Sequence, residues 1–416
     1  MRTKTKLTLI GSALACGAVA PPSALAGGLE LYELGTPDVG LASAGYAARA
    51  DDASTLFKNP AGMSRLEGLQ LQGGLQATYG SVSFTPNANT SNSLGRDGGG
   101  NAIGWLPGGS LFITDKLSDQ WSVGLGILSY LGLAADYNDH WVGRYYVQNS
   151  ALLGFSLMPT VSFKANDWLS LGAGLNAMDG AFNEQVAINT GSPIDGQMTL
   201  KDTTWGFGAN AGVLIEPAKG TRFGITYLSR VNLDFSATPS FRLFSLPGAS
   251  ALDLGVKVPQ SVMLSAYQDL NEKWALMADC GWQDWSQFGE VNVGVAGGSV
   301  IRTINAHYQD TFHGAFGAQY RPCEHWQFTG GVAFDSSAVE SQYRTITMPM
   351  GQAWRFGVGA LYHASAKLDL GLAYEYMYGG DLSVDQGQAG SQRGRVAGSY
   401  NDTWFNFITL NLTYRF

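Results

Sequence analysis

The sequence predicts an all-β membrane protein, a transmembrane β-barrel of fourteen antiparallel strands plugged by a small N-terminal hatch. Many segments alternate apolar and polar residues, tight polar turns alternate with long loops, and the segment 404–416 alternates up to an aromatic residue, Phe416. Such a long strand would expose its edge to other chains, whereas a closed ring of strands has no edge. Within a bilayer, only helices and closed barrels satisfy every backbone hydrogen bond.

Residues 1–26 have the features of a secretory signal peptide. Three basic residues open the segment: Arg2, Lys4 and Lys6. The apolar stretch 7–20 is too short to span a bilayer as a helix, and Ala24 and Ala26 form a small-x-small cleavage site. The alternative is a lipoprotein signal that ends at Cys16. We expect an exported protein in the outer membrane of a Gram-negative bacterium.

Composition narrows the class of protein further. Charged residues make up 14% of the chain, against roughly 25% in an average soluble domain. The mean hydropathy of −0.03 is too low for a bundle of transmembrane helices. A net charge of −8 argues against nucleic acid as a partner.

From Glu67 onward the chain repeats a strand, a tight turn, a strand and a long loop. Six short turns are rich in Asp, Asn, Gly and Pro: 115–119, 164–167, 216–220, 269–273, 321–324 and 364–367. Seven longer connections fall at about 85–105, 133–149, 191–202, 237–255, 287–308, 339–351 and 381–400. These connections separate an even number of strands, so both ends of the barrel segment 67–416 are expected on the periplasmic side, with the short turns.

The alternation predicts which face of the barrel meets lipid. Leu71 and Leu75 belong to an apolar, outward set, and Gln72 and Gln76 belong to a polar, lumenal set. Glycine is frequent in the lumenal sets of other strands, at Gly124, Gly126, Gly172, Gly174, Gly206 and Gly208. Glycine normally weakens a strand, so we expect it here to leave room for a plug or a ligand.

The segment 27–66 does not alternate, and small residues dominate it. Asp51 and Ser54 are candidate helix caps. A barrel of this size otherwise encloses an aqueous lumen or a cavity. We therefore expect these residues to form a compact hatch inside the barrel.

Three stretches of sequence carry a resemblance to a known family. The run 40–62 contains the triplet Asn59, Pro60 and Ala61; the run 132–145 contains Trp-Val-Gly-Arg-Tyr; and the run 282–288 reads Trp-Gln-Asp-Trp-Ser-Gln-Phe. In combination they resemble the FadL/TodX family of outer-membrane transporters for hydrophobic compounds. With the strand count and Phe416, the resemblance covers the whole mature chain.

The resemblance implies uptake of hydrophobic small molecules, most of all long-chain fatty acids, with monoaromatic hydrocarbons as the alternative cargo. It also implies capture at an extracellular apolar groove and transfer to a lumenal pocket. Exit follows past the hatch or through a lateral gap at a kink in the third strand, about 121–133. Gly124, Gly126 and Gly132 are candidates for the kink, because glycine permits a break in pairing; simple packing against the hatch is the alternative for each.

Six further residues are candidates for contact with cargo. Phe241, Leu243, Phe244 and Leu246 lie in a loop that should not carry such residues if it were simply solvated. They form either a capture surface or a helix packed on its neighbour. Arg230 and Arg355 are assigned to the lumen by alternation and could bind a fatty-acid carboxylate. Their alternative is pairing with acids of the lumen or the hatch, because a buried charge needs a partner.

Rival functions have less support in the sequence. An outer-membrane enzyme would need a catalytic motif, and neither His-Glu-x-x-His nor Gly-x-Ser-x-Gly occurs. Alternation places His313 in the lumen near Asp335, as ordinary polar lining. A general diffusion porin would not be expected to carry such a plug. We expect no catalytic residues, cofactor or metal site, and a monomer whose partners are its hydrophobic cargo and the outer-membrane lipid.

Overall fold

The computed structural model describes residues 32, 34–243, 250–295 and 300–416. The predicted signal peptide, 1–26, lies outside the described residues, as do Phe244 and Leu246. Among the described residues, none of the helices has both the length and the apolar character needed to cross a bilayer.

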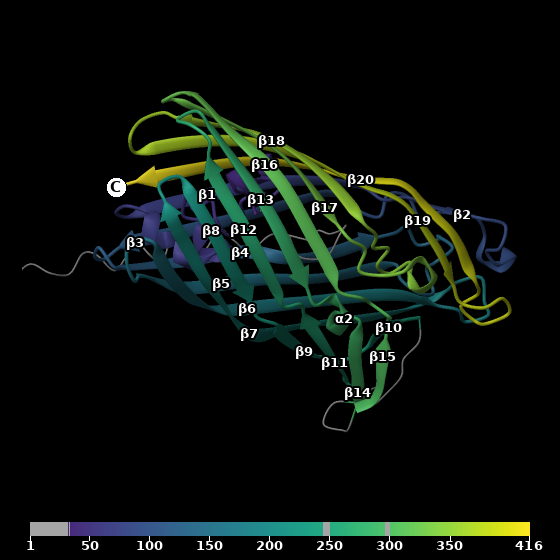
Figure 1. The fold of residues 1–416 in the computed structure, drawn as a ribbon. Helices are drawn as coiled ribbons and strands as arrows, with labels where there is room; N and C mark the ends of the chain where they lie inside the picture. The colour runs from purple at the N-terminus through teal and green to yellow at the C-terminus, as the bar shows by residue number, and fades with distance from the viewer. Residues whose placement is uncertain (1–31, 33, 244–249, 296–299) are drawn as a thin grey trace, which may run out of the picture.

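Fourteen antiparallel strands form the barrel, as predicted (Figure 1). In order around the ring they are β1 (Gln70–Ser81), β3 (Gly104–Lys116), β4 (Trp121–Asp136), β5 (Asn149–Lys164), β6 (Leu169–Ile188), β7 (Gly196–Ala218), β8 (Thr221–Leu228), β12 (Ser261–Asp269), β13 (Trp274–Gln283), β16 (Thr311–Cys323), β17 (Trp326–Asp335), β18 (Ala353–His363), β19 (Leu368–Gln386) and β20 (Val396–Arg415). Two short strands extend the sheet: β2 (Phe84–Pro86) pairs with β20, and β10 (Ser240–Arg242) pairs with β7.

The ring closes between its first and last strands. β1 and β20 pair without interruption from Gln70 opposite Arg415 to Ser81 opposite Trp404. The edge that the last strand would otherwise expose is thereby paired. Each of the six predicted short turns joins two barrel strands at one end of the molecule.

The two faces of the wall follow the predicted alternation. Leu75 is 72% exposed and Phe207 is also 72% exposed, whereas Gln72 and Gln76 are buried in the lumen. Aromatic residues gather near the strand ends, for example where Tyr79 meets the exposed Trp105 with ring centroids 5.1 Å apart. The outward face is therefore apolar with aromatic margins, as expected for a surface in lipid.

The long connections are more regular than the sequence suggested. β9 (Val231–Ala237), β11 (Leu252–Val258), β14 (Glu290–Val295) and β15 (Val300–Asn305) form a separate four-stranded sheet beside the end of the barrel with the long loops (Figure 1). The predicted loop 381–400 was too long, because β19 and β20 stay paired as far as Gln386 opposite Val396. The ends of β19 and β20 within 381–400 lack the regular apolar alternation of lipid-facing strands, so the sequence pattern placed the ends of these two strands too early. The remaining short elements of the loops are η4 (Asn92–Leu94), α2 (Trp285–Phe288) and η5 (Ser341–Tyr343).

The described part of the predicted hatch lies inside the barrel, toward the end that carries the C-terminus (Figure 1). It contains η2 (Pro37–Leu41), α1 (Thr55–Lys58) and η3 (Pro60–Arg65). η2 packs on β16 to β20, and η3 packs on β3 to β7. The segment therefore contacts both sides of the lumen and plugs it.

Lumenal glycines make room for this plug. A Cβ added to Gly331 would collide with the carbonyl oxygen of Leu41, and one added to Gly224 would collide with that of Ala47. Gly212 lies in the same way against the side chain of Asn59. The hatch backbone thus approaches the wall more closely than a larger residue would allow.

Candidate functional site

The triplet Asn59, Pro60 and Ala61 fixes the hatch to the wall. The Asn59 amide donates from Nδ2 to the carbonyl oxygens of Ala47 at 2.7 Å and Val213 at 3.0 Å, and its Oδ1 accepts from the Ala61 amide at 3.1 Å. Pro60 starts η3, a position that needs no backbone donor. Asn59 is completely buried. One side chain thereby joins two parts of the hatch to β7.

A buried cluster of charges holds the hatch together internally. Asp38 accepts from Arg49 Nε at 2.9 Å and from Thr36 Oγ1 at 3.0 Å, and it also forms an ion pair with Lys58. Arg49 pairs in addition with Asp52. Burial alone would raise the pKa of the Asp52 carboxyl, but the charge of Arg49 and hydrogen bonds from Ser54 hold it below its ordinary value. The Asp52 carboxylate is therefore ionised at neutral pH.

A second charged cluster joins the hatch to the opposite wall. Arg355 donates from Nε to Asp335 at 2.8 Å and lies 3.5 Å from Glu375. His313 Nδ1 lies 2.7 Å from Asp335, and its Nε2 lies 3.2 Å from the hydroxyl of Ser43 in the hatch. The order serine, histidine, aspartate resembles a catalytic relay. Here Ser43 is completely buried, however, and Arg355 shares the carboxylate, so the cluster fastens the hatch to the wall.

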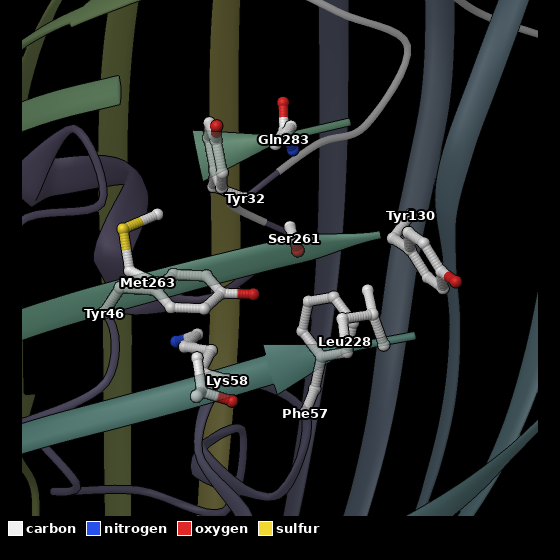
Figure 2. A pocket seen from close by; sticks show the side chains of 10 residues that line it. Tyr32, Tyr46, Phe57, Lys58, Tyr130, Leu228, Ser261, Met263 and Gln283 are labelled. Carbon is white, nitrogen blue, oxygen red and sulfur yellow. The ribbon is translucent and has the colours of Figure 1, made fainter. Parts of the chain in front are cut away.

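A cavity lies between the hatch and the barrel wall (Figure 2). Its volume is about 20 Å³, enough for one water-sized group. Lys58 and Tyr46 lie on one side, and Phe57, Leu228 and Tyr130 lie on the other. The remaining lining residues are Tyr32, Thr226, Ser261, Met263 and Gln283. The cavity is therefore amphipathic, with a buried cation on one side and apolar side chains on the other.

The wall beside this cavity is interrupted at β4. Pairing between β3 and β4 runs from Lys116 opposite Ser122 to Ser110 opposite Leu128. Beyond that point β3 continues along β1 alone, and β4 continues along β5. The separation ends where the Asp136 amide donates to the Ala102 carbonyl at 2.8 Å. Between Ser110 and Ala102, β3 is therefore not hydrogen-bonded to β4, and the wall has a gap between these two strands.

One extra residue in β4 accounts for the separation. Leu128 pairs with Ser156 and Leu131 pairs with Gly154, so three steps on β4 match two on β5. Such a bulge bends its strand away from the neighbour on the other side. Tyr130 lies in the bulge, lines the cavity and has its ring centroid 5.2 Å from that of Phe57 in the hatch. The interruption and the cavity therefore meet at one residue.

The three glycine candidates do not lie in the bulge. A Cβ on Gly124 or Gly126 would press on Leu56 of the hatch, at 2.8 and 2.9 Å respectively. These two glycines therefore leave room for the hatch, the alternative that the sequence left open. Gly132 lies just beyond the bulge, paired with Leu153.

Both candidate arginines are paired with acids. Arg355 is in the lumen, as alternation predicted, within the cluster described above. Arg230 lies in the connection between β8 and β9 rather than on a strand, so alternation does not apply to it. It donates from Nη2 to Asp284 at 2.7 Å. Its side chain is 31% exposed.

The loop candidates differ in their surroundings. Phe241 belongs to β10 and pairs in register with Met198 of β7, whereas Leu243 is 63% exposed. The structure thus gives Phe241 a strand where the sequence suggested a loop or a helix.

Sequence reasoning missed Lys58 and Tyr130, although both line the cavity. Lys58 directly follows an apolar pair, Leu56 and Phe57, within the expected hatch, and a lysine in such a place was the available signal. Tyr130 falls within the expected third strand, 121–133, but the bulge depends on pairing with β5 and leaves no local signature. Among the described residues, no group of three or more His, Cys, Asp and Glu side chains is arranged to hold a metal ion.

Comparison with known proteins places this architecture in a family. Residues 17–416 match the family described as outer membrane protein transport protein (OMPP1/FadL/TodX). The chain is 27% identical to the long-chain fatty acid transport protein of Salmonella typhi, over 93% of this chain and 95% of that protein. It is 26% identical to outer membrane protein P1 of Haemophilus influenzae, over 96% of this chain and 97% of that protein.

Solved structures share the fold. A FadL homologue from Pseudomonas aeruginosa superposes with a TM-score of 0.83 at 20% identity, over 94% of this chain and all 100% of that chain. The toluene transporter TbuX of Ralstonia pickettii superposes with a TM-score of 0.68 at 18% identity, over 93% of this chain and 99% of that chain. The predicted resemblance, the barrel and the outer-membrane location are confirmed, and the family is one of transport proteins rather than enzymes. The chain belongs to the OMPP1/FadL/TodX family of outer-membrane transport proteins for hydrophobic compounds.

Proposed function

We propose that this transporter takes up long-chain fatty acids. Cargo is captured at the extracellular side, moves into the cavity between hatch and wall, and leaves sideways through the interruption in β4. The single observation that carries the proposal is the position of Tyr130, which lies in the bulge and also lines the cavity. Through this point the cargo would pass from the lumenal cavity directly into the membrane lipid, without crossing an aqueous phase.

The physical case rests on the cost of exposing apolar surface. Apolar surface gains about 25 cal/mol per Å² when it leaves water, so a water-filled pore offers a hydrocarbon chain nothing. A plugged lumen with an apolar pocket and a side opening suits such cargo better. Phe241 and Leu243 belong to the proposed capture surface, together with Phe244 and Leu246, which lie outside the described residues.

Fatty acid is favoured over aromatic hydrocarbon by the character of the cavity. Lys58 supplies a buried positive charge to the cavity, whose lining also includes the polar residues Tyr46 and Gln283, and a carboxylate forms a strong hydrogen bond with such a cation. A monoaromatic hydrocarbon, the alternative cargo, has no carboxylate to pair with Lys58. Similar proteins are named for both kinds of cargo, a long-chain fatty acid transport protein and a toluene transporter.

We further propose the division of the chain into a signal peptide at 1–26, a hatch at 27–66 and a barrel at 67–416. The triplet Asn59, Pro60 and Ala61 is proposed as the anchor of the hatch. The working unit is proposed to be a monomer, because one barrel contains the whole route. The membrane lipid around the wall receives the cargo.

Binding measurements distinguish the two cargoes. We expect the purified protein to bind oleate, and toluene to displace the bound oleate only weakly. We also expect mass spectrometry of protein extracted from its native membrane to find bound fatty acid. Tight toluene binding with no affinity for oleate would favour the hydrocarbon channel instead. Large steady conductance in a planar bilayer would favour a diffusion porin.

The two arginines are tested by the same oleate assay. Arg230→Ala is expected to weaken oleate binding through loss of a partly exposed cation between β8 and β9. Arg355→Ala is expected to lower stability by about 3–5 kcal/mol, because it leaves the buried carboxylates of Asp335 and Glu375 without their cation. Thermal unfolding separates the effects; unchanged oleate affinity in both variants contradicts a role for either in cargo binding.

A further inference from the structure

The side chain of Lys58 faces the cavity although it is almost fully buried. Lys58 is 3% exposed and ends α1, where Asn59 and Pro60 follow at once and fix the backbone. Its Nζ donates to Ser54 Oγ at 2.8 Å and pairs with Asp38. A buried ammonium group requires an anion beside it, so Lys58 keeps a carboxylate partner in whatever state the hatch adopts.

If Asp38 loses its ion pair with Lys58, its carboxylate still has other partners. Its carboxylate also accepts from Arg49 Nε at 2.9 Å and from Thr36 Oγ1 at 3.0 Å. Arg49 is itself held by Asp52 and by Asp51, the latter at 3.7 Å. Two cations of the described part of the hatch, Arg49 and Lys58, thus share Asp38, and of these two it is Lys58 that lines the cavity. An anion that reaches Lys58 can therefore replace Asp38 there without leaving the Asp38 carboxylate unpaired.

The cavity gives an amphiphile one preferred orientation. A carboxylate at Lys58 would lie beside Tyr46, and the attached chain would extend past Phe57 and Leu228 toward Tyr130 (Figure 2). Tyr130 also receives a hydrogen bond from Asn176 Nδ2 at 2.7 Å, which fixes its ring at the bulge. The chain of the cargo would therefore point at the interruption in the wall.

We propose that Lys58 is the residue that selects carboxylate-bearing cargo, and that Asp38 occupies the place of the cargo carboxylate when the cavity is empty. The inference rests on the proposed function and adds to it the basis of selection. The cavity as it stands, about 20 Å³, holds only one water-sized group, so it must widen to admit the chain of the cargo. As it widens, the cargo carboxylate takes over Lys58 and Asp38 withdraws to Arg49. Occupation of the cavity and movement of η2, which contains Asp38, are thereby coupled.

The test compares two ligands with the same chain, oleate and oleyl alcohol, in the full-length purified protein. The wild type is expected to bind oleate more tightly, by roughly ten- to a hundred-fold, the range of a hydrogen bond to a charged group. Lys58→Met is expected to remove that difference and leave the affinity for oleyl alcohol unchanged, while Lys58→Arg restores it. Lys164→Met, an exposed lysine at the end of β5, is the matched control and is expected to change neither affinity.

Asp38→Asn tests the exchange separately. Because the amide competes less well for Lys58, oleate is expected to bind more tightly to this variant than to the wild type, with little change for the alcohol. Equal wild-type affinities for the two ligands, or an oleate preference that persists in Lys58→Met, would overturn the role of Lys58 and leave fatty-acid transport intact. Unchanged or weaker oleate binding in Asp38→Asn would overturn the exchange. A wild type that binds neither ligand would overturn the proposed function as well.

Discussion

Deleting Tyr130 is expected to abolish oleate uptake by cells while the protein still folds and reaches the outer membrane. The deletion removes the one extra residue between Leu128 and Leu131, so β4 and β5 pair without a bulge. A straight β4 then continues beside β3 beyond Ser110, and the wall closes. Uptake of labelled oleate is measured in a strain that carries only the variant.

The matched control for this deletion is Tyr130→Ala. Both variants lack the tyrosine ring, and only the deletion shortens the strand. Tyr130→Ala is expected to weaken oleate binding, through loss of the contact with Phe57, and yet to retain uptake. Equal uptake by the deletion variant and by Tyr130→Ala would show that the cargo does not leave through the interruption.

Replacing Gly331 with valine is expected to loosen the hatch and to raise the ion conductance of a barrel that otherwise conducts little. A Cβ at Gly331 collides with the carbonyl oxygen of Leu41, which belongs to η2 and cannot turn aside as a side chain would. Overpacking of this kind costs about 1–3 kcal/mol, which raises the population of displaced hatch by roughly 5- to 150-fold. Planar-bilayer recording measures the frequency of open events.

The neighbouring residue provides the control for this substitution. Gly330 lies on the same strand with the opposite orientation, and the nearest atom to its added Cβ is the Gly357 carbonyl oxygen at 4.0 Å. Gly330→Val is therefore expected to remain as quiet as the wild type. Identical conductance of the two valine variants would mean that close contact at Gly331 does not hold the hatch in place.

The fold could be predicted because a barrel strand repeats one simple rule. Successive side chains along a strand point to opposite faces of the wall. The apolar Leu75 and the polar Gln76 therefore indicate the lipid face and the lumenal face from the sequence alone. The same parity placed His313 beside Asp335, and the two side chains are 2.7 Å apart. The lumenal glycines predicted room for a plug or a ligand, and of those named in advance Gly124, Gly126 and Gly172 do lie against the hatch.

The candidate site depends on pairings between distant segments, which local pattern does not report. The bulge at Tyr130 is defined by the register of β4 against β5, and it contains none of the three glycines that were candidates for the kink. Arg230 was assigned by parity to a strand that ends two residues earlier, at Leu228. Lys58 is positioned by the hatch fold, which has no repeating period from which a direction can be read.

Cross-linking with a photoreactive fatty acid tests the central proposal most directly, since it asks whether cargo occupies the cavity between hatch and wall. The probe carries a diazirine on its chain, and the labelled peptides are identified by mass spectrometry with and without excess oleate. We expect labels on the peptides that contain Phe57, Tyr130 and Leu228, all suppressed by oleate. Labels restricted to outward residues such as Leu75 and Leu410, and insensitive to oleate, would contradict the proposed route.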